Sequence, residues 1–166
     1  HHSYPYCWRH KTPLIFASTP QWFISMDKSG LLEGSIQAVK DVEWEPSWGY
    51  ERIKSMLEGR PDWCISRQRS WGVPIPLIIN KKTGEIHPKQ NLLFNEIADR
   101  IDEEGLEAWE KVNLEDLIDD HDEYIKATDT LDVWFDSGST HFCVLDKLYG
   151  KDLIADLYLE GSDQHR

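Results

Sequence analysis

The last ten residues, LYLEGSDQHR, take a short apolar run directly into several polar side chains. At the end of a strand, Glu160 can accept a hydrogen bond from an ammonium or hydroxyl group, and Asp163 can accept two charge-assisted hydrogen bonds from a ribose diol. Gly161 lets a ligand approach the backbone closely. The alternative is that Ser162 or Asp163 caps a following helix, and both roles can hold together.

A second polar cluster, ISRQRSWG, follows an apolar segment. Arg67 and Arg69 lie two positions apart, so in an extended chain they share one face and can bind an anion. Trp71 followed by Gly72 offers a flat apolar wall beside backbone that a ligand can approach. The alternative is that the two arginines are surface groups that pair with carboxylates of the same chain.

Two further groups contain residue types that bind metals. Asp132 and Asp136 in DVWFDSG lie four positions apart, which on a strand separates them by roughly 13 Å, too far for one ion. Cys7 and His10 in CWRH have the spacing of half a zinc site, but a structural zinc site needs four ligands. The sequence therefore predicts no complete metal site and leaves zinc binding through Cys7 and His10 open.

The overall composition predicts a folded chain with a core. The 166 residues are 40% hydrophobic, and 30 acidic against 18 basic residues give a formal net charge of −12. This charge argues against a protein whose main role is to bind phosphates over a broad surface. Scattered cysteines and the lack of an apolar stretch of about 18 residues predict a reduced, cytoplasmic protein without a membrane partner.

The elements that must position these clusters are predicted from periodicity and from turn residues. Three prolines within residues 1–25 favour extended segments over helix. In SWGYERIKSMLEGRP the apolar residues fall on one helical face, and Gly59 is placed to end a helix near Glu58. Residues 75–79 predict a strand, and KKTG followed by EIHP predicts a small hairpin.

Residues 91–112 have apolar positions at helical spacing, interrupted at Gly105, and Asn113 begins another short helix. We interpret this acidic helical stretch as an insertion. Alternation over 131–135 and the apolar run 153–159 predict two strands. Because ligands of open α/β sheets bind at the carboxyl ends of strands, the polar clusters lie where a binding site is expected.

Five motifs, taken in order, resemble the catalytic core of isoleucyl-tRNA synthetases of the bacterial type, which are class I aminoacyl-tRNA synthetases. They are HSYPYCWRHKTP, PQWFISMD, RPDWCISRQRSWGVPIP, DTLDVWFDSGSTH and YLEGSDQHR. The related valine and leucine enzymes share the ISRQ stretch and are the alternative specificities. The last two motifs are more similar to the isoleucine enzyme, and the resemblance extends over essentially the whole chain.

The resemblance implies an α/β fold: part of a class I Rossmann-like catalytic domain, with a stalk segment and an α+β connective-peptide insertion. It also implies that the chain is an internal fragment. Residues 1–58 would be the return stalk of the first connective peptide and a linking helix, and 59–79 the start of the second half of the nucleotide-binding fold. Residues 80–128 would be the second connective peptide, and 129–166 further strands of that second half.

The resemblance also implies roles for individual residues. Glu160 would contact the aminoacyl-adenylate, Gly161 and Asp163 would face the adenosine ribose, and Gln164 would lie beside the amino acid. Trp71 matches a tryptophan that forms a wall of the pocket for the isoleucine side chain. No residue of the chain is assigned as catalytic.

The implied reaction joins isoleucine to ATP, with Mg²⁺, to form isoleucyl-adenylate, and then transfers the aminoacyl group to tRNA(Ile). Such chemistry depends on positioning and electrostatic stabilisation rather than on a side-chain nucleophile. The His-Ile-Gly-His and Lys-Met-Ser-Lys-Ser type signatures that bind the ATP phosphates are absent from these residues. We therefore expect the 166 residues alone to have no aminoacylation activity.

Two other functions fit the composition. Eight tryptophans could belong to a tryptophan-rich binding module for a carbohydrate or a protein, with the polar clusters on its surface. The chain could also act only as a folding unit or as a platform that contacts tRNA, in which case its negative charge predicts weak, salt-sensitive binding.

Overall fold

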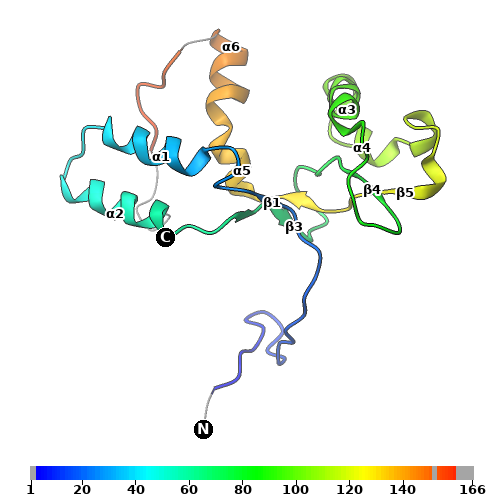
Figure 1. The fold of residues 1–166 in the computed structure, drawn as a ribbon, viewed down its shortest axis with the longest axis horizontal. Coiled ribbons are helices and arrows are strands. Elements are labelled where there is room, and N and C mark those ends of the chain that lie inside the picture. Colours follow the sequence, from blue (N-terminus) through cyan, green and yellow to red (C-terminus); the bar gives the residue numbers. More distant parts are fainter. Residues whose placement is uncertain (1–2, 151–152, 160–166) are drawn as a thin grey trace.

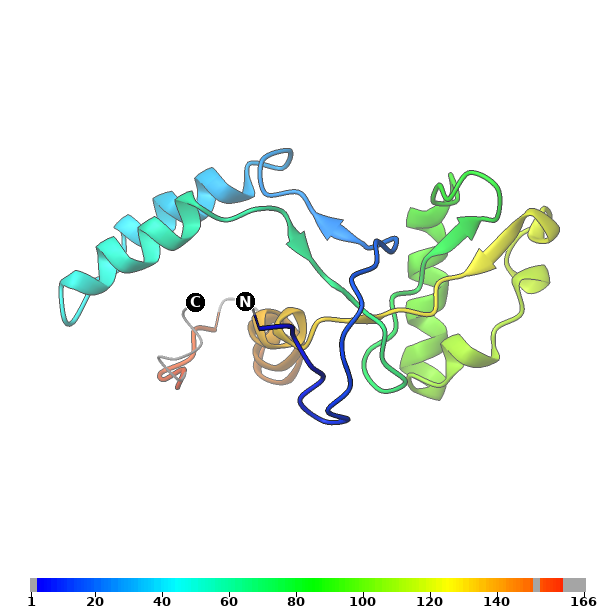
Figure 2. The same ribbon diagram turned by 90° about the horizontal axis from the view of Figure 1, so that it is seen from below.

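The computed structural model describes residues 3–150 and 153–159. Helices and short strands extend in several directions from one crossing of strands (Figure 1). A pair of helices lies on one side of this crossing, a helical module lies on the other, and the N-terminal arm projects away from both. Figure 2 shows the same separation of helix pair and module after a 90° turn.

Two short antiparallel strand pairs form the crossing. β1 (Phe23–Ile24) pairs with β2 (Trp63–Cys64), and β3 (Ser66–Arg67) pairs with β6 (Thr130–Leu131). Helices and short strands are mixed along the described chain, which is consistent with the predicted α/β class. Because each strand here has only two residues, backbone pairing alone fixes the crossing weakly, and side-chain hydrogen bonds must contribute.

The helix pair consists of α1 (Leu31–Lys40) and α2 (Trp48–Glu58). The connection between them is closed by Trp44, whose indole Nε1 donates a hydrogen bond to the carbonyl oxygen of Val39 at 3.0 Å. α2 ends where the sequence predicted, and Gly59 follows it as the C-cap. Neither helix contains a fully buried residue, so the pair packs on itself without forming a closed core.

The module begins with a hairpin. β4 (Ile78–Asn80) pairs with β5 (Tyr124–Lys126), and the chain turns back after β4 so that Ile86 pairs with Ile79. The Asn80 side chain closes this turn by accepting hydrogen bonds from two following backbone N–H groups at 2.9 and 3.1 Å. The hairpin predicted for KKTGEIHP is confirmed.

Four helical segments complete the module: α3 (Gln90–Glu104), α4 (Ala108–Lys111) and the 3₁₀ turns η1 (Leu114–Asp116) and η2 (His121–Glu123). The helical periodicity predicted for this stretch is confirmed. Its interruption falls at Gly105, which ends α3 with a positive φ of 82° that glycine adopts without strain. The short helix predicted after α4 is the single turn η1.

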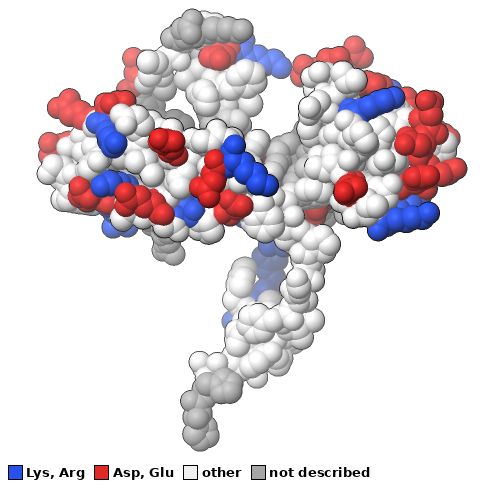
Figure 3. Space-filling view, in the orientation of Figure 1, with Lys and Arg blue, Asp and Glu red and all other residues white. Residues whose placement is uncertain are grey.

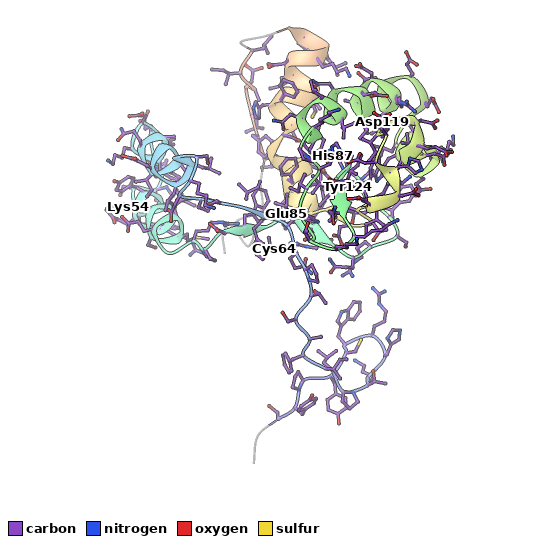
Figure 4. The ribbon with its side chains drawn as sticks, turned by 45° about the vertical axis from the view of Figure 1, so that its right-hand side comes forward. Lys54, Cys64, Glu85, His87, Asp119 and Tyr124 are labelled. Atoms are coloured by element: carbon purple, nitrogen blue, oxygen red, sulfur yellow. The ribbon has the colours of Figure 1, made fainter. Side chains whose placement is uncertain are left out.

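The module has a hydrophobic core of its own. Its buried cluster consists of Ile78, Leu93, Ile97, Trp109 and Ile118. His87 and Tyr124 lie close together within the module (Figure 4), with ring centroids 4.7 Å apart in an edge-to-face arrangement. His87 is buried, and its Nε2 lies 3.5 Å from the carboxylate of Asp120. The module is therefore held together by buried contacts among its own residues.

The strand predicted for 131–135 is wrong beyond its first residue. β6 ends there, Asp132 becomes an N-cap, and α5 (Val133–Gly138) begins at the next residue. The Asp132 carboxylate accepts a hydrogen bond from the backbone N–H of Trp134 at 3.3 Å, which satisfies one of the unpaired donors of the first helical turn. Alternation over five residues was too short to distinguish a strand from a capped helix.

The C-terminal part continues as the π-helical turn η3 (His141–Asp146) and α6 (Lys147–Tyr149). The strand predicted for 153–159 is also wrong, because this segment has no strand pairing among the residues that the structure describes. Its Tyr158 hydroxyl lies 3.0 Å from the Ser137 hydroxyl, so the chain returns alongside α5.

Much of the chain's surface remains uncovered. Its accessible area is 13398 Å², whereas a compact monomer of 19.4 kDa exposes about 8,500 Å². Acidic groups gather on the outer side of the module, and the N-terminal arm carries few charges and exposes Ile15 and Phe16 (Figure 3). Among the described residues, no helix combines the length and the apolar character that crossing a membrane requires.

Lys126 connects β5 to the end of α4. Its ammonium donates hydrogen bonds to the carbonyl oxygens of Trp109, Glu110 and Val112 at 2.6, 2.9 and 2.8 Å. Burial lowers the pKa of Lys126, and the negative charge of Glu110 opposes that effect. The ammonium thus uses all three of its donors on the carbonyl groups at this helix end.

Replacing Lys126 should therefore destabilise the module. We expect Lys126→Met to lower the free energy of unfolding by about 1–3 kcal/mol, because three carbonyl oxygens lose their partner. Urea unfolding measures this change. Lys82→Met, on the exposed hairpin turn, is the matched control and should stay within about 0.5 kcal/mol of the parent. Equal effects of the two substitutions would contradict this role of Lys126.

Candidate functional site

The loop of residues 68–73 is tied to β6 at both ends. At its start, Thr130 Oγ1 donates a hydrogen bond to the carbonyl oxygen of Arg67 at 3.2 Å. At its end, the backbone N–H of Leu131 donates to the carbonyl oxygen of Val73 at 2.7 Å. One short strand therefore holds the backbone of the whole loop.

Trp71 lies on this loop with its side chain 92% exposed. The next residue, Gly72, has a φ of 142°, and a Cβ placed there would lie 3.1 Å from the Cβ of Thr130. A side chain at position 72 would thus require a backbone conformation that residues other than glycine rarely adopt and would crowd Thr130 on β6. The result is a large aromatic side chain that is open to a ligand while its backbone is held.

Asp132 links this region to α5. Its Oδ2 accepts hydrogen bonds from the indole Nε1 of Trp63 at 3.1 Å and from the Arg67 guanidinium at 2.8 Å. Its Oδ1 accepts the backbone N–H of Trp134, as described above. Since Asp132 is only 4% exposed, these three donors replace the water that would otherwise solvate its charge.

A second polar network connects the N-terminal arm to the same loop. Ser66 Oγ accepts the backbone N–H of Trp22 at 2.9 Å and donates to Gln21 Oε1 at 2.7 Å. The Gln68 amide donates to Asp129 Oδ1 at 2.9 Å and to Gln21 Oε1 at 3.3 Å. This network thus fixes the loop at Gln68, and Asp132 holds Arg67, the residue directly before the loop.

The two arginines of ISRQRSWG have different environments. Arg67 forms an ion pair with Asp132, so for Arg67 the structure supports the alternative of pairing within an acidic chain. Arg69 donates a hydrogen bond to the carbonyl oxygen of Gln68 at 3.2 Å and is exposed. The structure therefore does not join the two arginines into one anion site.

Asp132 is the N-cap of α5, and Asp136 lies in the first turn of the same helix. Within the described part of the chain, no group of three or more His, Cys, Asp or Glu side chains is arranged to hold a metal ion. Burial raises the pKa of Asp136, and the negative charge of Asp132 raises it further. The two carboxylates thus repel each other across the first turn of α5.

The sulfur of Cys7 lies 3.7 Å from His10 Nδ1, and the turn between them is closed by a hydrogen bond of 2.8 Å from the Lys11 N–H to the Cys7 carbonyl oxygen. Zinc binds sulfur at about 2.3 Å and nitrogen at about 2.0–2.1 Å, so two tetrahedral ligands lie about this far apart. The pair therefore fits half of a zinc site. Among residues 3–150 and 153–159, no further ligand completes it.

Four of the predicted site residues, Glu160, Gly161, Asp163 and Gln164, lie outside the described residues. Of the predicted site residues, the structure therefore describes Trp71, and it places this residue on the loop held by β6. Sequence reasoning missed the contact of Gln21 with the loop and the contacts of Trp63 and Arg67 with Asp132 beside it. The N-cap signal of an aspartate before VWFDSG was available, but the contact to Trp63 spans 69 positions and left no local pattern.

Comparison with known proteins identifies the class. The family model for tRNA synthetases class I (I, L, M and V) matches residues 9–166, and the chain belongs to this family. The loop of residues 68–73 and helix α5 therefore lie in a class I synthetase domain.

Within this family, the similar relatives are isoleucine-tRNA ligases. The chain is 57% identical over 166 residues to the one from Pseudoalteromonas atlantica, 59% to that from Idiomarina loihiensis and 58% to that from Coxiella burnetii. Each alignment covers 99% of this chain and 18% of the relative. The chain therefore spans less than a fifth of the length of these relatives.

The raised pKa of Asp136 has a consequence for stability. A raised carboxyl pKa means that the folded state binds this proton more tightly than the unfolded state does. The contribution of Asp136 to the free energy of unfolding is therefore most favourable at low pH. It is lost as the pH rises above about 4, the ordinary pKa of an aspartate carboxyl. Asp136→Asn should remove this loss, so its stability relative to the parent should increase between about pH 3 and pH 7.

Urea unfolding at a series of pH values measures this difference. The exposed Asp119→Asn is the matched control and should show a smaller change with pH. If the stability of Asp136→Asn relative to the parent stays constant or falls as the pH rises, the carboxylates of Asp132 and Asp136 do not repel each other.

Proposed function

We propose that this chain is part of an isoleucine-tRNA ligase, which activates isoleucine with ATP to isoleucyl-adenylate and transfers the aminoacyl group to tRNA(Ile). The single observation that carries the proposal is the identity of 57% to 59% over 99% of the chain to isoleucine-tRNA ligases. The motifs DVWFDSGSTH and YLEGSDQHR support isoleucine over valine or leucine.

The proposed fold assignments follow the order of the elements. Residues 1–58 form the stalk of the first connective peptide and the linking helix, and 80–128 form the second connective peptide. Residues 59–79 and 129–166 belong to the second half of the Rossmann-like nucleotide-binding fold. The separate core of the module supports the boundaries of the second connective peptide, because its buried residues come almost entirely from within 80–128.

The proposed site uses the exposed face of the loop and the final segment of the chain. Trp71 forms a wall of the pocket for the isoleucine side chain, where a flat aromatic surface suits a branched aliphatic group. Glu160 contacts the aminoacyl-adenylate, Gly161 and Asp163 face the ribose, and Gln164 lies beside the amino acid. The open side chain of Trp71 on a held backbone supports its part of this assignment.

ATP enters this proposal as a substrate, and Mg²⁺ as an ion that neutralises its phosphates. Because the chain lacks the two phosphate-binding signatures, it supplies positioning and the amino-acid pocket rather than the phosphate site. We therefore propose that the 166 residues alone have no aminoacylation activity. The whole protein would act in the cytoplasm, and the Cys7 and His10 pair would bind zinc only if two further ligands join it.

Isoleucine-dependent exchange of pyrophosphate with ATP tests the proposed function and site. The assay requires this chain within a protein of the full length of its relatives. We expect Glu160→Ala and Asp163→Ala each to lower the exchange rate by about tenfold to a thousandfold, because each removes a hydrogen-bond partner of the adenylate. Asp156→Ala, an exposed carboxylate shortly before the site, is the matched control and should exchange at the parent rate.

Two outcomes would count against the proposal. Exchange that depends on valine or leucine and not on isoleucine would make the chain part of another member of the family. Exchange at the parent rate in both site variants would mean that the final segment caps a helix and does not hold the adenylate.

A further inference from the structure

The Arg67 guanidinium and the Asp132 carboxylate form a continuous connection between two stretches of backbone. Arg67 Nη1 donates hydrogen bonds to the carbonyl oxygens of Cys64 and Ser66 at 2.9 and 2.8 Å, and Nη2 donates to Asp132 Oδ2 at 2.8 Å. On its other side, Asp132 Oδ1 accepts the backbone N–H of Trp134. Every link from the β2 and β3 backbone to the α5 backbone is therefore a hydrogen bond.

This connection leaves the start of α5 little freedom to move relative to β2 and β3. The guanidinium is planar and its donors form a rigid fork, so two carbonyl oxygens on one side fix the direction of the third bond. The Trp63 indole donates to the same Asp132 oxygen at 3.1 Å, and its ring packs on Phe135 with centroids 6.0 Å apart. The start of α5 is thus fixed relative to β2 by both polar and aromatic contacts.

The position of Asp132 in the chain gives this connection a functional consequence. Arg67 immediately precedes the loop of residues 68–73, which carries Trp71, and Asp132 immediately follows β6, which holds both ends of that loop. We propose that Asp132 is a positioning residue for amino-acid activation, because its carboxylate sets where the loop and α5 lie relative to each other. This inference rests on the proposed function, since it concerns the pocket wall assigned to Trp71.

The connection should affect isoleucine binding more than ATP binding. The loop carries the proposed wall for the amino-acid side chain, whereas the phosphate-binding signatures lie outside these residues. A displacement of the loop by about 1 Å is enough to cost up to about a hundredfold in a reaction that depends on orientation. A loss of Asp132 should therefore raise the KM for isoleucine while the KM for ATP changes little.

The test compares four proteins of full length: the parent, Asp132→Asn, Arg67→Gln and the double variant. We expect each single variant to raise the KM for isoleucine in pyrophosphate exchange by about tenfold to a hundredfold. Since both substitutions break the same connection, the double variant should be no worse than the worse single variant. Lys54→Gln, on α2, replaces a cation that lies away from the crossing in Figure 4 and is the matched control.

Asp132→Ser separates the connection from the helix cap. Serine can still cap α5, but its short side chain cannot also reach Trp63 and Arg67. If the connection matters, Asp132→Ser should raise the KM for isoleucine as Asp132→Asn does. A parent-like KM in Asp132→Ser, additive effects in the double variant, or equal increases in the KM for isoleucine and ATP would overturn the proposal.

Amide hydrogen exchange measured by mass spectrometry on the same proteins provides a readout that does not require activity. Asp132→Asn should increase exchange at least about threefold in peptides covering 66–75 and 130–138, and leave a peptide covering 90–104 unchanged. Unchanged exchange in the first two peptides would overturn the positioning role. A parent protein without isoleucine-dependent exchange of pyrophosphate would instead refute the proposed function, and the amide readout would still decide whether Asp132 holds the loop.

Discussion

A buried carboxylate must have partners, and this requirement at Asp132 organises the centre of the chain. Removing an aspartate from water costs several kcal/mol unless donors replace the lost solvation. Here an indole, a guanidinium and a backbone N–H supply these donors, from β2, β3 and the first turn of α5. Strands of two residues could not fix this crossing by themselves, so the side chain of Asp132 supplies what backbone pairing lacks.

The helix pair and the module contribute little to this crossing. The helix pair has no buried residue, and the module closes around its own core through Ile78 and Trp109. The large accessible area shows that the chain leaves several faces uncovered. The chain spans 18% of the length of the relatives that it matches. The hydrogen bonds of the crossing lie directly beside the loop that carries the proposed pocket wall, Trp71.

Local sequence signals predicted the elements that local interactions stabilise. The end of α2 at Glu58, the hairpin after β4 and the interruption at Gly105 all follow from periodicity and turn residues. The helix after Asp132 was missed because its alternating apolar residues resembled a strand. The Asp132 side chain that caps this helix is also held by Trp63 and Arg67, which are distant in the sequence. The placement of Trp71 on a held loop required contacts with β6, about 60 positions further along, which no local pattern contains.

The role of Asp132 is tested most directly by the hydrogen exchange rates of the tryptophan indole N–H groups, measured by NMR on the parent chain. If Asp132 accepts the Trp63 indole as described, the Trp63 N–H should exchange at least about tenfold more slowly than that of the exposed Trp71. Asp132→Ser should abolish this difference. A Trp63 indole that exchanges as fast as Trp71 in the parent chain would contradict the claim that Asp132 holds the crossing together.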